Sequence, residues 1–478
     1  MVGDEPNAPF VGNRLLISVS SFWSQARPTL ALALPIIAGQ VAQMAMGLVD
    51  SAMVGQVGVI PLAAAAFANT LISVPLVFGI GLMLALSIRI SQVRGTQNDD
   101  GADTKIAELL RHGIVLALVA GITLALSLWI GSHYLDKFGQ NADVALESRV
   151  FLLWVGASIP FVLLMFGLKN FCEALDNPWA PTLILSASVP LNIVFNWVLI
   201  YGNLGAPALG LAGAGIATLL ARVLSCVALW IYVTRAPRFA ARMPVRWLAP
   251  LDWERLNVLL RLGVPTALQI VLEVGAFSAA ALMVGWIGPK PLAAHQIVLA
   301  CAGTTFMIPL GISFAASIRA GTMAHQPGRA RALGNNALTL ALISAGTSAT
   351  FYLIFRTAIA RAFVDDSVVA GIATQLFLVV AIFQVVDGIQ VMAAGLLRGL
   401  SDATAPMLIS LGCYWGIGLP LGYIAGFRLG LGALGVWIGL AVALACAACA
   451  LVLRFRNRTA GDGENRRVEE VPVDALSY

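Results

Sequence analysis

Charged side chains are scarce in this chain, and their scarcity excludes a water-soluble fold. Asp, Glu, Lys and Arg make up 11% of its 478 residues, whereas 59% are hydrophobic. A soluble domain is about one quarter charged, because charged groups cover its surface. So few charges leave lipid as the expected solvent, and the composition predicts an all-α membrane protein.

Patterns typical of metal, redox and nucleotide chemistry are also lacking. The four histidines show no metal-ligand spacing, and no GxxxxGKS/T motif for an ATP-driven pump occurs. Cys446 and Cys449 have CxxC spacing, but they lie in the last apolar stretch, where helix packing is favoured over redox or metal chemistry. We therefore expect no cofactor. The net charge is +5, but the basic residues lie in connecting segments and do not form a basic face. We therefore expect no nucleic-acid partner.

Apolar runs long enough to cross a bilayer recur along the chain. A spanning helix needs about 20 mostly apolar residues, and twelve segments meet this condition. They lie at 29–54, 60–90, 108–132, 148–171, 179–201, 211–234, 258–286, 291–318, 334–360, 368–396, 403–426 and 432–454. Residues 1–27 lack the compact apolar core of a cleavable signal peptide. Residues 15–25 are expected to form a short interfacial helix.

The distribution of basic residues indicates the orientation in the membrane. If the N-terminus is cytoplasmic, only six of the 29 Lys and Arg residues fall in outer segments, as the positive-inside rule requires. The six are Lys137, Arg149, Lys290, Arg356, Arg361 and Arg428. Twelve spans then place both termini in the cytoplasm. We expect a multi-pass protein of the inner membrane.

Two similar halves emerge when the sequence is shifted by 230 residues. The matched pairs include Pro35 with Pro265, Gly58 with Gly288, and Ser87-Ile88-Arg89 with Ser317-Ile318-Arg319. Each half has an even number of spans, so the halves are parallel repeats about an axis along the membrane normal. The predicted organisation is a cytoplasmic segment 1–27, a six-helix lobe 28–235, a cytoplasmic linker 236–256, a six-helix lobe 257–455 and a polar cytoplasmic tail 456–478.

Three carboxylates lie well inside apolar spans: Asp50, Glu273 and Asp387. Each costs about 2.5–3.5 kcal/mol at the bilayer centre. A structural interpretation is that they only form hydrogen bonds between helices. Against it, Arg222 is the one basic residue expected inside a span, so at most one of the three acids can pair with it. The acids are therefore candidate functional groups.

Polar side chains accompany each acid on its own helix face. Gln40 and Gln43 share a stripe with Asp50, Gln269 with Glu273, and Gln384 and Gln390 with Asp387; Asn192 and Asn196 form another i, i+4 pair. Such stripes suit a water-filled cavity or an ion site better than lipid. Carboxyl groups there can exchange a proton for Na⁺ or for a cationic substrate, which is the chemistry that an antiporter needs.

Prolines within the spans mark positions where helices can bend. Pro35 and Pro265 are candidate hinges, because a helical proline frees a backbone carbonyl. Static kinking is the alternative interpretation. Pro190, Pro309 and Pro420 also lie within spans.

Four segments in this order resemble the multidrug and toxic compound extrusion (MATE) family, in its NorM-like bacterial branch. They are LALPIIAGQVAQMAMGLVDSAMVG (32–55), PLAAHQIV (291–298), IPLGISFAASIRAG (308–321) and FQVVDGIQVMAAGLLRGLSD (383–402). The resemblance covers residues 28 to 455. It implies two pseudo-symmetric six-helix lobes in a V-shaped bundle, acting as a monomer that expels organic cations by inward flow of Na⁺ or H⁺.

The resemblance also implies roles for residues. Glu273 and Asp387 would form the ion site of the second lobe, with Na⁺ as the bound metal. Asp50 would form a substrate or proton site with Asn192 and Asn196 in the first lobe. The branch commonly has Tyr four residues before the last acid, where this chain has Phe383.

Other classes of protein fit the sequence less well. A lipid-linked precursor flippase of the same superfamily predicts helices beyond twelve and a strongly basic central cavity. A membrane-embedded enzyme predicts clustered catalytic groups, which the sequence does not contain. A passive channel is disfavoured by the repeated, proline-bent bundle.

Overall fold

The computed structural model describes residues 19–96, 101–139, 141–247 and 249–460, and these residues form helices without any strand. The first half contains α1 (Val19–Gly55), α2 (Val59–Gly95), α3 (Ala102–Gly131), α4 (Ala142–Ala157), α5 (Ile159–Ala174), α6 (Trp179–Tyr201) and α7 (Gly210–Arg235). The second half contains α8 (Trp253–Ile287), α9 (Pro289–Thr322), α10 (Pro327–Phe363), α11 (Ser367–Gly399), α12 (Thr404–Ser410), α13 (Leu419–Tyr423) and α14 (Gly432–Arg458). Short 3-10 helices are η1 (Ser132–Phe138), η2 (Asn203–Gly205) and η3 (Pro237–Arg242), and π-helices are η4 (Leu411–Gly418) and η5 (Ile424–Arg428).

The described residues contain twelve helical segments long and apolar enough to cross a membrane, which confirms the predicted number of spans. Two spans are interrupted. The fourth divides into α4 and α5 at Ser158, two residues before Pro160. The eleventh, Thr404–Arg428, passes through η4 and η5 on either side of α13, which contains Pro420. Proline has no N–H to donate to the preceding turn, which favours a bend or a break at these positions, whereas α1 and α8 continue through Pro35 and Pro265.

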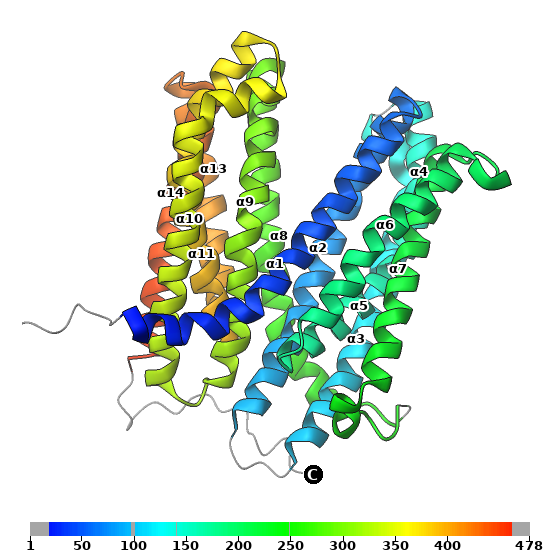
Figure 1. The fold of residues 1–478 in the computed structure, drawn as a ribbon. Coiled ribbons are helices and arrows are strands. Elements are labelled where there is room, and N and C mark those ends of the chain that lie inside the picture. Colours follow the sequence, from blue (N-terminus) through cyan, green and yellow to red (C-terminus); the bar gives the residue numbers. More distant parts are fainter. Residues whose placement is uncertain (1–18, 97–100, 140, 248, 461–478) are drawn as a thin grey trace, which may run out of the picture.

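The helices form two lobes that diverge as the arms of a V (Figure 1). We call α1–α7 the N-lobe and α8–α14 the C-lobe. The lobes meet at one end of the bundle, which we call the closed end, and diverge toward the opposite, open end. Contacts of α2 with α8 and α9 join them. Glycines permit this approach, since a Cβ on Gly263 would lie 2.8 Å from Leu82 Cδ1.

The sequence repeat corresponds to a repeated turn at the open end. Gly58 precedes α2 with φ 157° and ψ 173°, and Gly288 precedes α9 with φ 148° and ψ 171°. This region of backbone conformation is accessible essentially to glycine alone. The two halves of the repeat therefore share this turn, and a side chain at either glycine would strain it.

The first turns of α1 lie across the C-lobe before the helix continues through the N-lobe (Figure 1). Asn336 Nδ2 donates to the Phe22 carbonyl at 3.1 Å, and Arg319 Nη1 donates to the Gln25 carbonyl at 2.9 Å. Ala26 is fully buried in a cluster of C-lobe side chains. The predicted interfacial helix at 15–25 is thus the beginning of α1 from residue 19, and residues 15–18 lie outside the described residues.

Most of the predicted linker, 236–256, is docked on the N-lobe at the closed end. Phe239 is 1% exposed and packs edge-on against Phe171, with 5.2 Å between ring centroids. Arg242 Nε lies 2.7 Å from Asp103 Oδ1. The linker therefore has its own contacts with one lobe.

Candidate functional site

The N-lobe brings Asp50 of α1 together with the asparagine pair of α6. Asn196 Nδ2 donates to Asp50 Oδ1 at 2.5 Å and to Asn192 Oδ1 at 3.1 Å. Thr218 of α7 lies 3.5 Å from Asp50 Oδ2. Both asparagines are fully buried. The i, i+4 spacing on α6 therefore does what helix geometry predicts, since it brings the two amides together, and Asn196 bonds to the carboxylate.

Several polar atoms of this N-lobe cluster have no hydrogen-bond partner among the described residues. They are Gln43 Nε2, Asn192 Nδ2 and Asn196 Oδ1, all buried. Buried polar groups are normally satisfied, so unpaired ones call for a ligand, an ion or water. Arg222 does not form an ion pair with Asp50; its Nη1 donates to Ser158 Oγ at 2.6 Å. The N-lobe cluster is thus incompletely bonded.

The C-lobe gathers three donors around one oxygen of Glu273. Gln269 Nε2 donates at 3.0 Å, Gln390 Nε2 at 2.7 Å and Ser410 Oγ at 3.0 Å, all to Oε1. Gln269 is on the same helix, α8, while Gln390 comes from α11. Ser410 is the last residue of α12, where the π-helix η4 begins. Such interruptions often lie at functional sites.

Asp387 completes this C-lobe cluster on α11. It is 8% exposed and lies within electrostatic range of Glu273. Its carboxylate has no hydrogen-bond donor among the described residues, and Glu273 Oε2 has none either. Glu273 Oε2 and the two Asp387 oxygens are therefore available to bind a cation or a proton. The described residues contain no group of three or more His, Cys, Asp or Glu that could hold a metal ion, so a Na⁺ site here would need neutral oxygens as well.

Gln384 does not join the C-lobe cluster, although the sequence places it on the same stripe as Asp387. Its Nε2 donates to the Ala302 carbonyl of α9 at 3.0 Å and to the Thr305 hydroxyl. Thr305 in turn bonds to Tyr352 of α10 at 3.0 Å. Gln384 therefore connects three helices and stands apart from the carboxylates in the hydrogen-bond network.

Aromatic rings surround the position where the resemblance expects a tyrosine. Phe383 is 3% exposed and packs against Phe277 and Trp437, with centroid distances of 5.9 and 5.4 Å. Trp437 Nε1 donates to His295 Nδ1 at 3.1 Å. His295 Nε2 is buried and has no partner among the described residues. The environment of Phe383 is apolar, so it contributes packing rather than an ion ligand.

The closed end contains charged groups that the sequence pattern did not reveal. Lys169 Nζ lies 2.7 Å from Glu173 Oε1, and both side chains are almost fully buried. Arg398 of α11 is 3% exposed, and its Nη1 lies 3.5 Å from Gln269 Oε1. Lys169 and Arg398 lie toward the ends of their helices at the closed end, so the expectation that Arg222 is the one basic residue inside a span stays a prediction.

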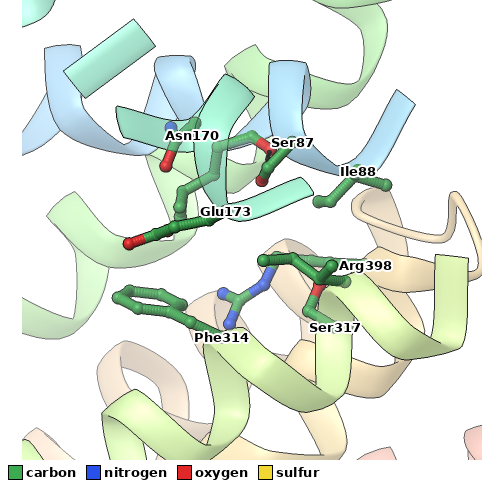
Figure 2. A pocket seen from close by; sticks show the side chains of 9 residues that line it. Ser87, Ile88, Asn170, Glu173, Phe314, Ser317 and Arg398 are labelled. Atoms are coloured by element: carbon green, nitrogen blue, oxygen red, sulfur yellow. Dashed lines mark hydrogen bonds between the residues drawn. The ribbon is translucent and has the colours of Figure 1, made fainter. Parts of the chain in front are cut away.

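Glu173 and Arg398 face a small shared void between the lobes (Figure 2). Its volume of about 10 Å³ is close to the minimum for one water molecule. The i, i+4 spacing of Lys169 and Glu173 is the signal that could have identified the pair. These groups link the closed end to the Gln269–Glu273 part of the C-lobe cluster.

The two candidate hinge prolines lie near contacts between helices. The Pro35 carbonyl accepts a hydrogen bond from Thr182 Oγ1 of α6 at 2.9 Å. Pro265 lies on α8 between Gly263 and Ala267, both of which face α2. Their role as moving hinges stays a prediction.

Comparison with known proteins agrees with this architecture. The MatE family model matches the chain twice, at residues 35–198 and 265–424. The two matches begin 230 residues apart, the same shift that relates the halves in the sequence. The chain is 36% identical to a probable multidrug resistance protein NorM of Mesorhizobium japonicum, over 92% of this chain and 95% of that protein. It is 34% identical to the multidrug resistance protein MdtK of Yersinia pestis, over 90% and 95%.

Solved structures share the fold. The Vibrio cholerae MATE transporter VcmN in its bent form superposes with a TM-score of 0.82 at 22% identity, over 92% of this chain and 98% of that one. Two lobes of six spans, the doubled match and relatives above 30% identity over nearly the full length lead to one conclusion. This chain is a membrane transporter, not an enzyme, and belongs to the MATE family beside the NorM-like proteins.

Proposed function

We propose that this protein is a multidrug antiporter of the inner membrane. It expels organic cations in exchange for Na⁺ or H⁺ and acts as a monomer. Its relatives' names, multidrug resistance proteins NorM and MdtK, support drug efflux. The family membership supports transport by a two-lobed carrier. The coupling and the substrate charge rest on the carboxylates.

The observation that carries the coupling is the unequal bonding of Glu273 and Asp387. Three donors converge on Glu273 Oε1, while Glu273 Oε2 and both Asp387 oxygens have no donor among the described residues. Two carboxylates in one low-dielectric site repel each other, and a cation or proton between them relieves that repulsion. Oxygen atoms are the ligands that hard cations prefer. We therefore assign the coupling ion to this cluster.

The N-lobe cluster is the second part of the proposal. Asp50 is only partly buried and accepts one short amide hydrogen bond, while amide atoms of Gln43 and Asn192 are unpaired. A protonated amine or quaternary cation at Asp50 would replace part of the water lost from its carboxylate. Drug binding or proton exchange at Asp50 is the role we propose for it.

We infer that the closed end faces the cytoplasm. Arg94, Arg319 and Arg398 lie in the last turns of helices at this end, in line with the positive-inside rule. Both termini then lie in the cytoplasm, and the open end faces outward. In the transport cycle this arrangement is the one that releases drug and admits the coupling ion.

The lipid-linked precursor flippase is less well supported as an alternative. The described residues contain twelve spans and no more. The buried cations Lys169 and Arg398 lie at the closed end, where Lys169 forms an ion pair with Glu173 and Arg398 donates to Gln269. A pyrophosphate-binding central cavity would instead need unpaired cations beside the carboxylate clusters.

The experiment that tests the proposal measures drug uptake into everted vesicles with Na⁺ and pH gradients imposed separately. Ethidium uptake should require one of the two gradients. Asp387→Asn and Glu273→Gln should abolish this gradient-driven uptake. Asp366→Asn is the matched control, because Asp366 lies outside the spans and asparagine also caps a helix. Uptake by Asp387→Asn equal to that of the parent would refute the assigned role.

A further inference from the structure

A larger pocket lies at the closed end and shares no lining residue with either carboxylate cluster. Its volume is about 710 Å³. Its walls come from α1, from the end of α2, from the turn between α5 and α6, and from the ends of α9 and α10. Both lobes therefore contribute to it.

Three arginines line this pocket against one acid. Arg94 Nη2 pairs with Asp176 Oδ2 at 2.5 Å, with side chains 27% and 64% exposed. Arg319 donates to the Gln25 carbonyl of α1 and has no carboxylate within salt-bridge distance among the described residues. Arg329 is exposed and has no partner in the described part of the chain. The described lining thus carries excess positive charge with unused donors.

The remaining lining is apolar and aromatic. Pro28, Ala31 and Leu32 of α1 form one side, and Trp179, the first residue of α6, contributes a ring that is 54% exposed. Tryptophan at the end of a spanning helix is typical of the membrane–water interface. Arginines beside an apolar wall at this depth suit an amphiphile better than a free ion.

We propose that this pocket binds the phosphate of an anionic phospholipid headgroup. Arg329 and the free edge of the Arg319 guanidinium donate to the phosphate oxygens, because planar guanidinium groups bind phosphate with paired hydrogen bonds. The acyl chains extend along α1. Inorganic phosphate presents the same oxygens without the chains, and it is the source that the experiment must separate from lipid.

Binding there links the two lobes. Arg94 and Trp179 belong to the N-lobe, whereas Arg319 and Arg329 belong to the C-lobe. A headgroup that contacts lining residues of both lobes binds with its highest affinity when the lobes meet at the closed end. Such a ligand shifts the population toward this arrangement, since a ligand favours the state that it binds more tightly.

The test uses the full-length protein and measures lipid retention by native mass spectrometry. Delipidated protein is mixed with phosphatidylglycerol or with phosphatidylcholine, and lipid adducts are counted at increasing activation energy. Arg329→Gln should weaken phosphatidylglycerol binding about fivefold, the effect of one basic residue near anionic lipid. Arg331→Gln is the matched control, because Arg331 is exposed on the same helix but does not line the pocket.

The outcomes separate the possibilities. Preferential retention of phosphatidylglycerol that Arg329→Gln lowers and Arg331→Gln does not would support the proposal. Equal loss in both variants, or equal retention of both lipids, would overturn it. A parallel titration with inorganic phosphate, followed by thermal shift, addresses the source: stabilisation that depends on Arg329 without any lipid preference would overturn the assignment to lipid. None of these readouts requires transport, so failure here is distinct from failure of the antiport proposal.

Discussion

Gly81 lies where α2 of the N-lobe meets α8 of the C-lobe, and an added methyl group should separate the lobes there. A Cβ on Gly81 would lie 2.7 Å from Ala267 Cα and 3.2 Å from the Ala267 nitrogen. Since backbone atoms cannot move aside as a flexible side chain can, overpacking should cost about 1–3 kcal/mol. Gly81→Ala should therefore disfavour the closed-end contact about 5- to 150-fold relative to a state in which α2 and α8 have separated.

The assay is a distance measurement between spin labels at the open end. Leu204 and Leu429 are suitable sites, because they are 82% and 68% exposed and lie in corresponding loops of the two lobes. Rocking of the lobes should bring these positions together when the closed end opens. In a background without native cysteines, Gly81→Ala should increase the population at short distance.

A matched control isolates the steric effect. A Cβ on Gly47 of α1 would meet no atom within 4 Å, so Gly47→Ala should leave the distance distribution as in the parent. If Gly81→Ala also left it unchanged, the lobes would not depend on this contact, and the account of the closed end would be wrong.

Three more contacts give measurable expectations. Asn196→Ala removes the donor 2.5 Å from Asp50 and should lower dye efflux about tenfold or more, since such bonds contribute about 1.5–3 kcal/mol; efflux equal to the parent's would contradict this. Glu173→Gln leaves a buried ammonium without its counter-charge and should cost about 3–5 kcal/mol, seen as a lower melting temperature in detergent; an unchanged melting temperature would count against the pair. Hydrogen bonding to Lys290 lowers the pKa of Asp366, so the pair should stabilise the protein at neutral pH and cease to do so as pH falls through that lowered pKa. The difference in melting temperature between the parent and Asp366→Asn should therefore vanish in acid, and a constant difference would refute the assignment.

The spans and the repeat could be predicted because each depends on local sequence. Backbone groups in lipid must bond within their own helix, so runs of about 20 apolar residues suffice to identify spans. The path of α1 could not be predicted in this way. Its first turns pack on the C-lobe through Phe22, Gln25 and Ala26, and such long-range contacts leave no periodic signal in the sequence.

The polar clusters were predicted in part. The i, i+4 spacing correctly joined Gln269 to Glu273 and Asn192 to Asn196, because partners on one helix are fixed by its geometry. Partners on different helices are fixed only by packing. Ser410 was therefore missed as a donor to Glu273.

Charged groups near helix ends were the other gap. Lys169 lies near the end of the fourth predicted apolar run, at 148–171, and Glu173 lies two residues beyond it, so they resembled residues of a connecting segment. In the structure the helix continues to Ala174 and both side chains are buried. Hydropathy locates the apolar centre of a helix better than its ends.

The most direct test of antiport is counter-transport in sealed liposomes that contain the purified protein. A drug gradient is imposed with no gradient of Na⁺ or H⁺, and movement of each ion is recorded with an internal indicator. We predict that one of the two ions moves against the direction of drug flow in the parent and in Asp366→Asn, but not in Asp387→Asn. Drug movement without opposed ion movement in the parent would contradict the account.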